Sequence, residues 1–480
     1  MYLERIKTRY PSALLVTALL VVALLVPYLM VHVGIIIGPL IAAAIFGIGF
    51  FVMMLKDYKL SVYACFFISV FMSFFDRAYD IPVPMGVVLD AIAVLSFFSI
   101  FLNPKDRPDW TDLKHPITYL YIFIVVYQLL QAFNPNAVSL VGWMVSLRGN
   151  TSFLLFLVFI HMFNSVSNLK KFTYLWLGLA LIVALYGIFQ EKFGLTDFET
   201  KWVYSSTGRA KLLFIWGHMR KFSFLSDPSA FGLFTGFSGL ACLVLAVGPF
   251  KQWHRIALFI MACLMFISMS FSGTRTAIAM VAIGVAFYIV LTIRTRRTLM
   301  ITVAVIVAVG LLLFGPFYNG TVKRIRSTFF SEGDASMGVR DKKRVRLQNY
   351  VLSHPFGGGI NTTGGNGLKY SKGHSLAEGW DADSGYLLTA LELGWIGLII
   401  GMAFFYAVIG KGIDNYFVIE DPFLKTITLA YIVPFMALSI AHFAQDAMFQ
   451  KPVYLVVTAT YALMIKLPSL EKQTTTNNIK

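Results

Sequence analysis

Charged side chains are scarce in this chain of 480 residues, since Asp, Glu, Lys and Arg together make up only 13% of it. Hydrophobic residues account for 58%. A water-soluble domain needs a far larger charged surface than this composition can supply. The composition therefore excludes an ordinary soluble enzyme.

Cysteine is also rare, and its positions argue against two kinds of site. The three cysteines, Cys65, Cys242 and Cys263, all lie in apolar runs, and no CxxC pair occurs. Zinc sites and disulfide frameworks need closely or regularly spaced ligands. The glycine-rich stretch at 357–367 lacks the lysine and the strand–helix context of a nucleotide-binding P-loop. We therefore expect no metal and no cofactor.

Acidic residues are the third shortage: 24 Asp and Glu face 40 Lys and Arg, which gives a formal net charge of +16. No basic soluble domain accompanies this charge, so nucleic acid is not a predicted partner. An anionic lipid surface or an anionic lipid-linked substrate fits the charge better.

Long apolar runs are what the chain has in abundance. Each run of about 17 to 22 residues is long enough to cross a bilayer core of roughly 30 Å. We predict an all-α, polytopic membrane helix bundle with about 12–14 transmembrane helices. The expected spans lie near 12–31, 34–55, 60–75, 85–102, 116–133, 151–167, 172–190, 228–249, 256–272, 276–293, 298–316, 385–410, 425–446 and 453–467.

Four regions follow from this pattern. Residues 1–316 form the N-terminal transmembrane helices, and 317–384 form one long periplasmic loop containing short helices. Residues 385–468 form the C-terminal transmembrane helices, and the polar tail at 469–480 is predicted to be disordered and cytoplasmic.

The Lys/Arg bias of the short connections predicts that both termini lie in the cytoplasm. Two segments on the opposite side, 191–227 and 317–384, are nevertheless rich in basic residues. Contact with anionic lipid headgroups is one explanation. A pocket for a polyanionic substrate is the other.

Three arginines stand at the predicted non-cytoplasmic ends of apolar runs: Arg148, Arg220 and Arg275. Such a side chain can simply extend to the headgroups. It can also bind phosphate through its planar, two-pronged set of donors. Arg275 is the most informative, because a guanidinium in a tight turn between apolar helices costs several kcal/mol unless it finds partners or water.

Asp383 opens the apolar run that follows the long loop. Its carboxylate could cap that helix. It could also accept a proton from a hydroxyl group. Within the same loop, Arg340, Arg346 and His374 are weaker candidates for the site.

Three sequence blocks resemble those of a known family. They are MRKFSFLSDPSAFGLF, SMSFSGTRTAIAMV, and LSHPFGGGINTTGG followed by DADSGYLLTALELGWIGLII. Their order, and the long loop between the last two, resemble the O-antigen ligase and polysaccharide polymerase family. Its members are bacterial membrane glycosyltransferases of the C type.

The resemblance implies a metal-independent glycosyltransferase acting outside the inner membrane on glycans carried by undecaprenyl pyrophosphate. Arg220 and Arg275 match the family's arginines, which hold the pyrophosphate, and Arg148 matches less closely. Asp383 stands eleven residues before the Gly394–Gly397 pair, where ligases that act on lipid A-core have His-Asn or His-Ser. This difference favours an O-antigen or exopolysaccharide polymerase.

The mechanism expected from the resemblance uses these residues in distinct roles. The three arginines stabilise the departing pyrophosphate, and Asp383 accepts the proton of the acceptor hydroxyl. The loop that carries Arg340 and Arg346 covers the site on the periplasmic side and excludes water. The implied partners are the lipid-linked glycan donor, a glycan or glycolipid acceptor, the bilayer and other polysaccharide export proteins.

Alternatives remain open at this point. One is an O-antigen ligase acting on lipid A-core, and another is a transporter that flips lipid-linked oligosaccharides. A flippase would need polar residues near the middle of the membrane and broken helices in two alternating halves. A membrane scaffold in an export complex is the third.

Overall fold

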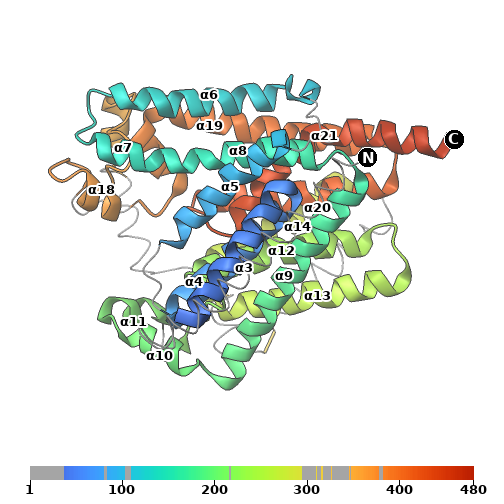
Figure 1. Cartoon of the computed structure of the whole chain (residues 1–480), viewed down its shortest axis with the longest axis horizontal. Helices are drawn as coiled ribbons and strands as arrows, with labels where there is room; N and C mark the ends of the chain where they lie inside the picture. Colours follow the sequence, from blue (N-terminus) through green and yellow to red (C-terminus); the bar gives the residue numbers. More distant parts are fainter. Residues whose placement is uncertain are drawn as a thin grey trace, which may run out of the picture.

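The computed structural model describes residues 37–79, 84–102, 110–215, 218–293, 310, 315–316, 326, 345, 347–377 and 382–479. In these ranges the chain is helical throughout, apart from connections and one short ladder in which β1 (Phe214–Ile215) pairs antiparallel with β2 (His218–Met219) (Figure 1). The α-helices are α3 (Ile37–Lys56), α4 (Tyr58–Tyr79), α5 (Met85–Leu102), α6 (Pro116–Leu130), α7 (Leu140–Ser146), α8 (Thr151–Met162), α9 (Val166–Phe193), α10 (Asp197–Tyr204), α11 (Thr207–Leu213), α12 (Pro228–Val247), α13 (Gln252–Phe271), α14 (Arg275–Thr292), α18 (Gly364–Tyr370), α19 (Gly385–Val418), α20 (Pro422–Ala441) and α21 (Val453–Ile479). The 3-10 turns are η1 (Thr111–Leu113), η2 (Gln131–Phe133) and η3 (Leu147–Asn150).

Eleven stretches of the described chain are helical, long and apolar enough to cross a membrane. The predicted all-α, polytopic membrane fold is therefore confirmed. The predicted span 12–31 lies outside the described residues, and so does 298–316 apart from residues 310, 315 and 316. The eleven candidate spans of the described chain are Tyr58–Tyr79, Met85–Leu102, Pro116–Phe133, Leu140–Met162, Val166–Phe193, Pro228–Val247, Gln252–Phe271, Arg275–Thr292, Gly385–Val418, Pro422–Ala441 and Val453–Thr475.

Three spans form the centre of the bundle. Among the eleven spans, α12, α20 and α21 have the largest shares of buried residues, and α12 packs against α13, α14 and α20. Polar contacts inside this core are satisfied: Trp176 Nε1 donates a hydrogen bond to Ser238 Oγ at 2.9 Å, and the Thr173 and Tyr431 hydroxyls lie 2.8 Å apart. Buried polar groups are tolerated in such a core only when they are paired.

Local sequence signals explain where the core helices begin. α12 begins at Pro228 because the Asp227 carboxylate accepts the N–H groups of Ser229 and Ala230 at 2.8 and 3.0 Å. A proline is well suited to the first helical position, where its missing N–H removes no helix bond. α20 starts in the same way, with Asp421 before Pro422.

α19 is interrupted at Gly394, which adopts φ 72° and ψ 178°. Such a break frees carbonyl groups of the preceding turn, and the glycine-rich run binds two of them. Gly358 N donates to Leu391 O at 2.8 Å, and Gly359 N donates to Glu392 O at 3.0 Å. A Cβ at Gly394 would overlap the Pro355 carbonyl. The glycine run thus docks the loop on the helix, and these N–H groups are not available to a phosphate.

The C-terminal tail differs from its prediction. α21 continues to Ile479, so a helix covers residues 469–479, where disorder was expected. Two polar side chains of this segment find partners: Ser469 Oγ donates to Asp112 Oδ1 at 3.0 Å, and Glu471 Oε1 accepts the Asp421 N–H at 3.2 Å. Polar composition alone did not reveal these contacts.

The segments predicted to be non-cytoplasmic gather at one end of the bundle, on the left in Figure 1. We call it the loop end. It carries residues 131–150, 194–227 as far as they are described, 272–274, 347–377 and 442–452. Asn134, Asn136 and Asn361 fasten the loop to the α6–α8 connection through bonds to Phe356 O, Gly357 O and Gly142 O.

Packing of α9 against α12 and α13 provides a test of the fold. A Cβ at Gly187 would overlap the buried Phe231 ring and lie 2.7 Å from Ser268 Oγ, whereas a Cβ at Gly401 would meet nothing within 4 Å. Gly187→Ala should lower the free energy of unfolding by about 1–3 kcal/mol, the cost of overpacking. Gly401→Ala should raise it by up to about 1 kcal/mol through helix propensity. Thermal unfolding in detergent measures both, and equal midpoints would contradict this packing.

Candidate functional site

Arg220 is bound to the turn that precedes Arg275. Its Nε donates to Ser272 O at 2.8 Å, and its Nη2 donates to Thr274 Oγ1 at 3.0 Å. The next residue, Arg275, begins α14. The structure thus ties Arg220 to the turn directly before Arg275, which lies 55 positions later in the chain.

Close helix packing holds this turn in place. A Cβ at Gly232 of α12 would overlap Ser272 Oγ and lie 3.2 Å from Thr274 Cβ, so only glycine leaves room for the turn. The Thr274 hydroxyl also donates to Pro228 O at 3.1 Å. Through this turn, the Arg220 guanidinium and the start of α14 are both tied to the N-terminal end of α12.

A further arginine, which the sequence analysis did not single out, anchors the segment that carries Arg220. Arg77 at the end of α4 is buried and donates to Leu225 O at 2.6 Å and to Ser223 O at 2.8 Å. Its guanidinium carbon lies 4.8 Å from the Phe222 ring centroid and 5.2 Å from that of Trp202. An arginine that ends an apolar helix is the signal that could have identified it.

Carboxylates near this turn are engaged elsewhere. Glu191 lies 3.6 Å from Lys221 Nζ and 3.3 Å from His218 Nε2. Glu199 is buried and accepts Gln190 Nε2 at 2.7 Å and the Thr196 N–H at 3.0 Å. Glu199 thus fixes the start of α10, and Glu191 offsets the charge of Lys221.

Arg148 lies in a different cluster. Its Nε and Nη2 each lie 2.7 Å from Asp90 Oδ2 on α5. Lys451, before α21, reaches the same place, because a Cβ at Gly86 would lie 3.1 Å from Arg148 Nη2 and 3.2 Å from Lys451 Nζ. The structure does not place Arg148 on the Arg220–Arg275 turn.

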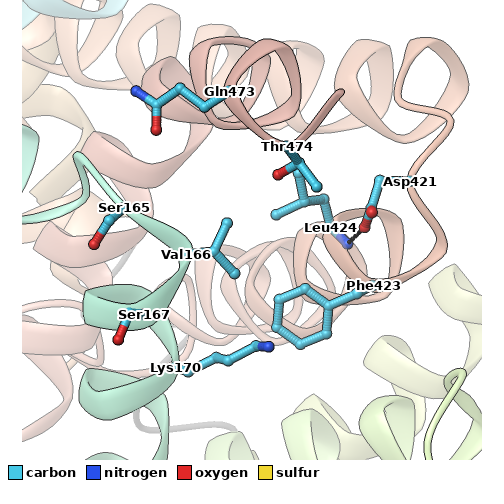
Figure 2. Close-up of a pocket in the computed structure, with 9 residues that line it drawn as sticks. All are labelled: Ser165, Val166, Ser167, Lys170, Asp421, Phe423, Leu424, Gln473 and Thr474. Atoms are coloured by element: carbon cyan, nitrogen blue, oxygen red, sulfur yellow. Dashed lines mark hydrogen bonds between the residues drawn. The ribbon is translucent and has the colours of Figure 1, made fainter. Parts of the chain in front are cut away.

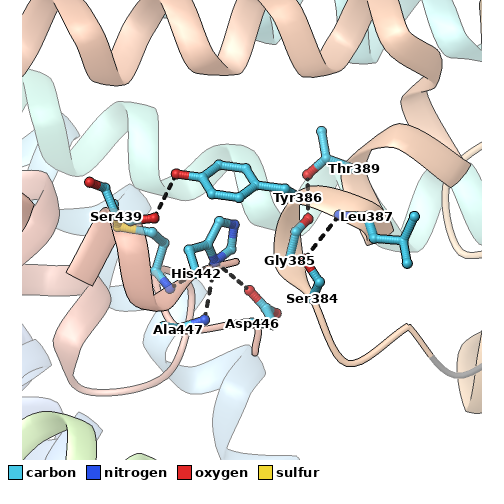
Figure 3. A network of polar contacts seen from close by, with 10 residues as sticks. Ser384, Gly385, Tyr386, Leu387, Thr389, Ser439, His442, Asp446 and Ala447 are labelled. Atoms are coloured by element: carbon cyan, nitrogen blue, oxygen red, sulfur yellow. Dashed lines mark hydrogen bonds and ion pairs between the residues drawn. The ribbon is translucent and has the colours of Figure 1, made fainter. Parts of the chain in front are cut away.

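Asp383 is not the cap of α19. Ser384 takes that role, and its Oγ accepts the Leu387 N–H at 3.3 Å (Figure 3). The capping explanation for Asp383 is therefore wrong, because the serine directly after it is the residue that caps the helix. Asp383 is exposed at the loop end, one residue before the helix cap.

His442 and Asp446 lie beside the start of α19 and were missed by the sequence analysis. Gly385 N donates to His442 O at 3.0 Å, and a Cβ at Gly385 would overlap the imidazole. His442 Nδ1 accepts the Ala447 N–H at 3.1 Å and lies 3.6 Å from Asp446 Oδ1 (Figure 3). Burial lowers the pKa of His442 to about 4 and raises that of Asp446 to about 6. The imidazole is thus neutral at pH 7, and its contact with Asp446 is no ion pair.

His374 is placed as an anchor of the loop. It is buried, and its Nδ1 accepts the Leu376 N–H at 3.1 Å. Burial lowers its pKa, so the imidazole is neutral at pH 7. Arg340 and Arg346 lie outside the described residues.

A pocket of about 430 Å³ lies at the opposite end of the bundle (Figure 2). It is formed by the starts of α9 and α20 and the last turns of α21, and its lining includes Lys170, Asp421 and Phe423. None of the predicted site residues lines it. Within the described ranges, no group of three or more His, Cys, Asp or Glu side chains is placed to hold a metal ion.

Comparison with known proteins identifies the region that contains the Arg275 turn and the start of α19. The family described as O-antigen ligase matches residues 256–402. This region belongs to the O-antigen ligase family. The family resemblance predicted from the sequence is thus confirmed. The match to the O-antigen ligase family includes Arg275 and Asp383 but neither Arg148 nor Arg220.

A protein of Salmonella muenchen named O-antigen polymerase is also similar. It is 28% identical over 193 residues, which are 39% of this chain and 46% of that protein. The similarity thus spans about half of the relative's length. Together with the helices described above, these comparisons show a multi-pass membrane protein whose residues 256–402 match the O-antigen ligase family.

The assignment of the α19 cap can be tested by its stability. Ser384→Ala removes the side-chain oxygen that accepts the Leu387 N–H, and should cost about 1 kcal/mol. Asp383→Ala removes a carboxylate that does not cap the helix, and should lower the unfolding midpoint in detergent less than Ser384→Ala does. If Asp383→Ala were instead the more destabilising of the two, the aspartate would be the cap.

Proposed function

We propose that this protein is a membrane glycosyltransferase that moves a glycan from undecaprenyl pyrophosphate to a sugar hydroxyl, and that it works as an O-antigen or exopolysaccharide polymerase. The observation that carries the proposal is the bonding of Arg220 to the Ser272–Thr274 turn, directly before Arg275. The similarity to an O-antigen polymerase supports the same reaction class.

Two arginines at one turn, Arg220 bonded to it and Arg275 directly after it, suit a diphosphate leaving group. Charge develops on the bridging oxygen as the sugar departs, and fixed cations stabilise it without reorganisation. A single contact at 4 Å contributes about 4 kcal/mol at an effective dielectric near 20. Because hydrogen bonds to Ser272 and Thr274 already orient Arg220, little side-chain freedom is lost when the diphosphate binds.

Asp383 is the proposed general base. The acceptor hydroxyl oxygen attacks the anomeric carbon, its proton passes to the Asp383 carboxylate, and the electron pair of the breaking C–O bond leaves with the diphosphate. Asp383 is exposed and does not cap α19, so its carboxylate can meet an acceptor. His442 and Asp446 hold the start of α19 and thereby position it.

The loop around α18 is proposed to cover the site and exclude water, since hydrolysis competes with transfer. Its attachment to α19 through Gly358 and Gly359, and to α7 through Asn361, gives the cover a rigid base. His374, which is buried and accepts the Leu376 N–H, helps to hold this loop in place. In the proposal, Arg340 and Arg346 act from the same loop.

A ligase that transfers the glycan to lipid A-core is the second candidate, and the description of the matching family favours it. Asp383 in place of the ligases' His-Asn or His-Ser favours a polymerase. In either case we propose the bacterial inner membrane as the location, with both termini in the cytoplasm and the loop end in the periplasm. The acceptor, the bilayer and other export proteins complete the proposed partners.

Arginine variants test the diphosphate site. Arg220→Ala or Arg275→Ala should reduce polymer formation by about 10²–10³-fold, as loss of a preorganised donor does. Arg275→Lys should retain part of the activity, because an ammonium cannot form the two-pronged contact. Arg209→Ala, in the same outer segment, is the matched control and should retain activity. Gel analysis of surface glycans from a complemented deletion strain gives the result, with membrane protein levels checked by immunoblot.

Near-wild-type chains from Arg220→Ala and Arg275→Ala would reject the site. The uncomplemented deletion strain in the same gel separates the two candidates. Single repeats on the acceptor with loss of long chains indicate a polymerase, whereas repeats stranded on the carrier lipid indicate a ligase.

The general base is tested separately from substrate binding. Asp383→Asn should lower the transfer rate by about 10²–10⁴-fold while leaving the apparent affinity for the lipid-linked donor unchanged. Purified enzyme with a lipid-linked repeat unit provides both values. An unchanged rate, or a loss confined to donor affinity, would remove Asp383 from this role.

A further inference from the structure

Arg148 and Lys451 form a second group of cations at the loop end. They come from distant parts of the chain, η3 and the residue pair before α21, and meet over Gly86 at the start of α5. A Cβ at Gly86 would lie 3.1 Å from Arg148 Nη2 and 3.2 Å from Lys451 Nζ. The absence of a side chain at Gly86 therefore leaves room for both cationic heads.

Asp90 is the carboxylate beside these two cations, and it forms an ion pair with Arg148. Asp90 Oδ2 binds both Nε and Nη2 of Arg148 at 2.7 Å, and its Oδ1 lies 3.3 Å from the Thr151 hydroxyl. Among the residues that the structure describes, Lys451 Nζ forms no hydrogen bond and no ion pair. The cluster therefore carries more positive than negative charge.

The surroundings of Lys451 make this excess costly. Lys451 is half-buried. Burial is the main cause that lowers the pKa of its ammonium; the nearby Asp90 carboxylate raises this pKa, and the Arg148 charge lowers it. A partly buried charge is destabilising unless an opposite charge or hydrogen-bonding partner meets it. An anion that touches both Arg148 and Lys451 would satisfy it.

A role limited to packing does not explain the arrangement. An ion pair between Asp90 and Arg148 alone would join α5 to η3, and a second cation at the same place weakens that pair by repulsion. The cluster lies at the loop end, where phosphate groups of an outer leaflet would be found if the proposed orientation holds. Arginine and lysine together are a common combination for binding phosphate.

We propose that Arg148 and Lys451 form a second anion site, which binds a phosphate or diphosphate group carried by a membrane lipid, with Asp90 positioning Arg148. The group belongs either to a second carrier-linked glycan, which is the source that rests on the proposed function, or to an anionic phospholipid. This site is distinct from the Arg220–Arg275 turn, so the protein binds two lipid-borne phosphate groups.

Calorimetry with farnesyl diphosphate as the probe tests the proposal on the purified full chain in detergent. Arg220→Gln weakens the first site and leaves the second to be observed. In that background, Lys451→Gln should reduce the affinity by about tenfold or more, the expected effect of losing one charged hydrogen bond. Lys451→Arg should remain within about threefold of the Arg220→Gln protein. Lys211→Gln, an exposed lysine on α11, is the control for charge alone and should bind unchanged.

Thermal unfolding of each variant separates binding from folding. If Lys451→Gln and Lys451→Arg both bind the probe as the Arg220→Gln protein does, the second site is overturned. It is also overturned if Lys451→Gln loses binding only in step with a lowered unfolding midpoint that Lys451→Arg shares.

Competition identifies the source of the phosphate group. Displacement of the probe by phosphatidylglycerol in mixed micelles indicates a phospholipid, and resistance to it indicates a diphosphate carrier. The two proposals fail differently. If Arg220→Gln binds the probe like wild type while Lys451→Gln does not, the second site stands and the proposed donor site fails.

Discussion

The hydrogen bonds from the Arg220 guanidinium to Ser272 O and Thr274 Oγ1 join two segments that also meet where Lys221 N donates to Phe271 O at 3.0 Å. One segment enters α12 after Asp227, and the other leaves α13 and starts α14 at Arg275. Gly232 leaves room for the Ser272–Thr274 turn against α12. Arg77 binds the first segment through Ser223 O and Leu225 O. Because a fixed guanidinium stabilises an anion without prior rearrangement, the phosphate chemistry proposed for this protein depends on these contacts.

The rest of the loop end supports this turn and the start of α19. The break of α19 at Gly394 exposes carbonyl groups, and the glycine run of the loop binds them. His442, held neutral by burial, supports Gly385 and so fixes where Asp383 emerges. Backbone contacts and small residues, which leave room for close approach, thus position the charged groups of the site.

The sequence alone predicted a large part of this arrangement. Apolar runs gave the spans because length and composition decide membrane crossing, and basic turns indicated Arg220 and Arg275. Other features depend on contacts between distant residues. The ion pair between Arg148 and Asp90 beside Lys451, the packing of His442 on Gly385 and the partner of Ser469 leave no periodic signal. The predicted cap of α19, Asp383, was wrong by one residue. Aspartate and serine are equally good caps, and only the backbone geometry shows that Ser384 is the cap.

The central claim is that Arg220 and Arg275 bind one diphosphate at the loop end. The most direct test is a cryo-electron microscopy structure of the full chain in lipid nanodiscs with a prenyl diphosphate bound. We expect density for the diphosphate within hydrogen-bonding distance of both guanidinium groups, with Arg220 still bonded to the Ser272–Thr274 turn. Diphosphate density remote from both arginines, with their side chains facing lipid, would contradict the account.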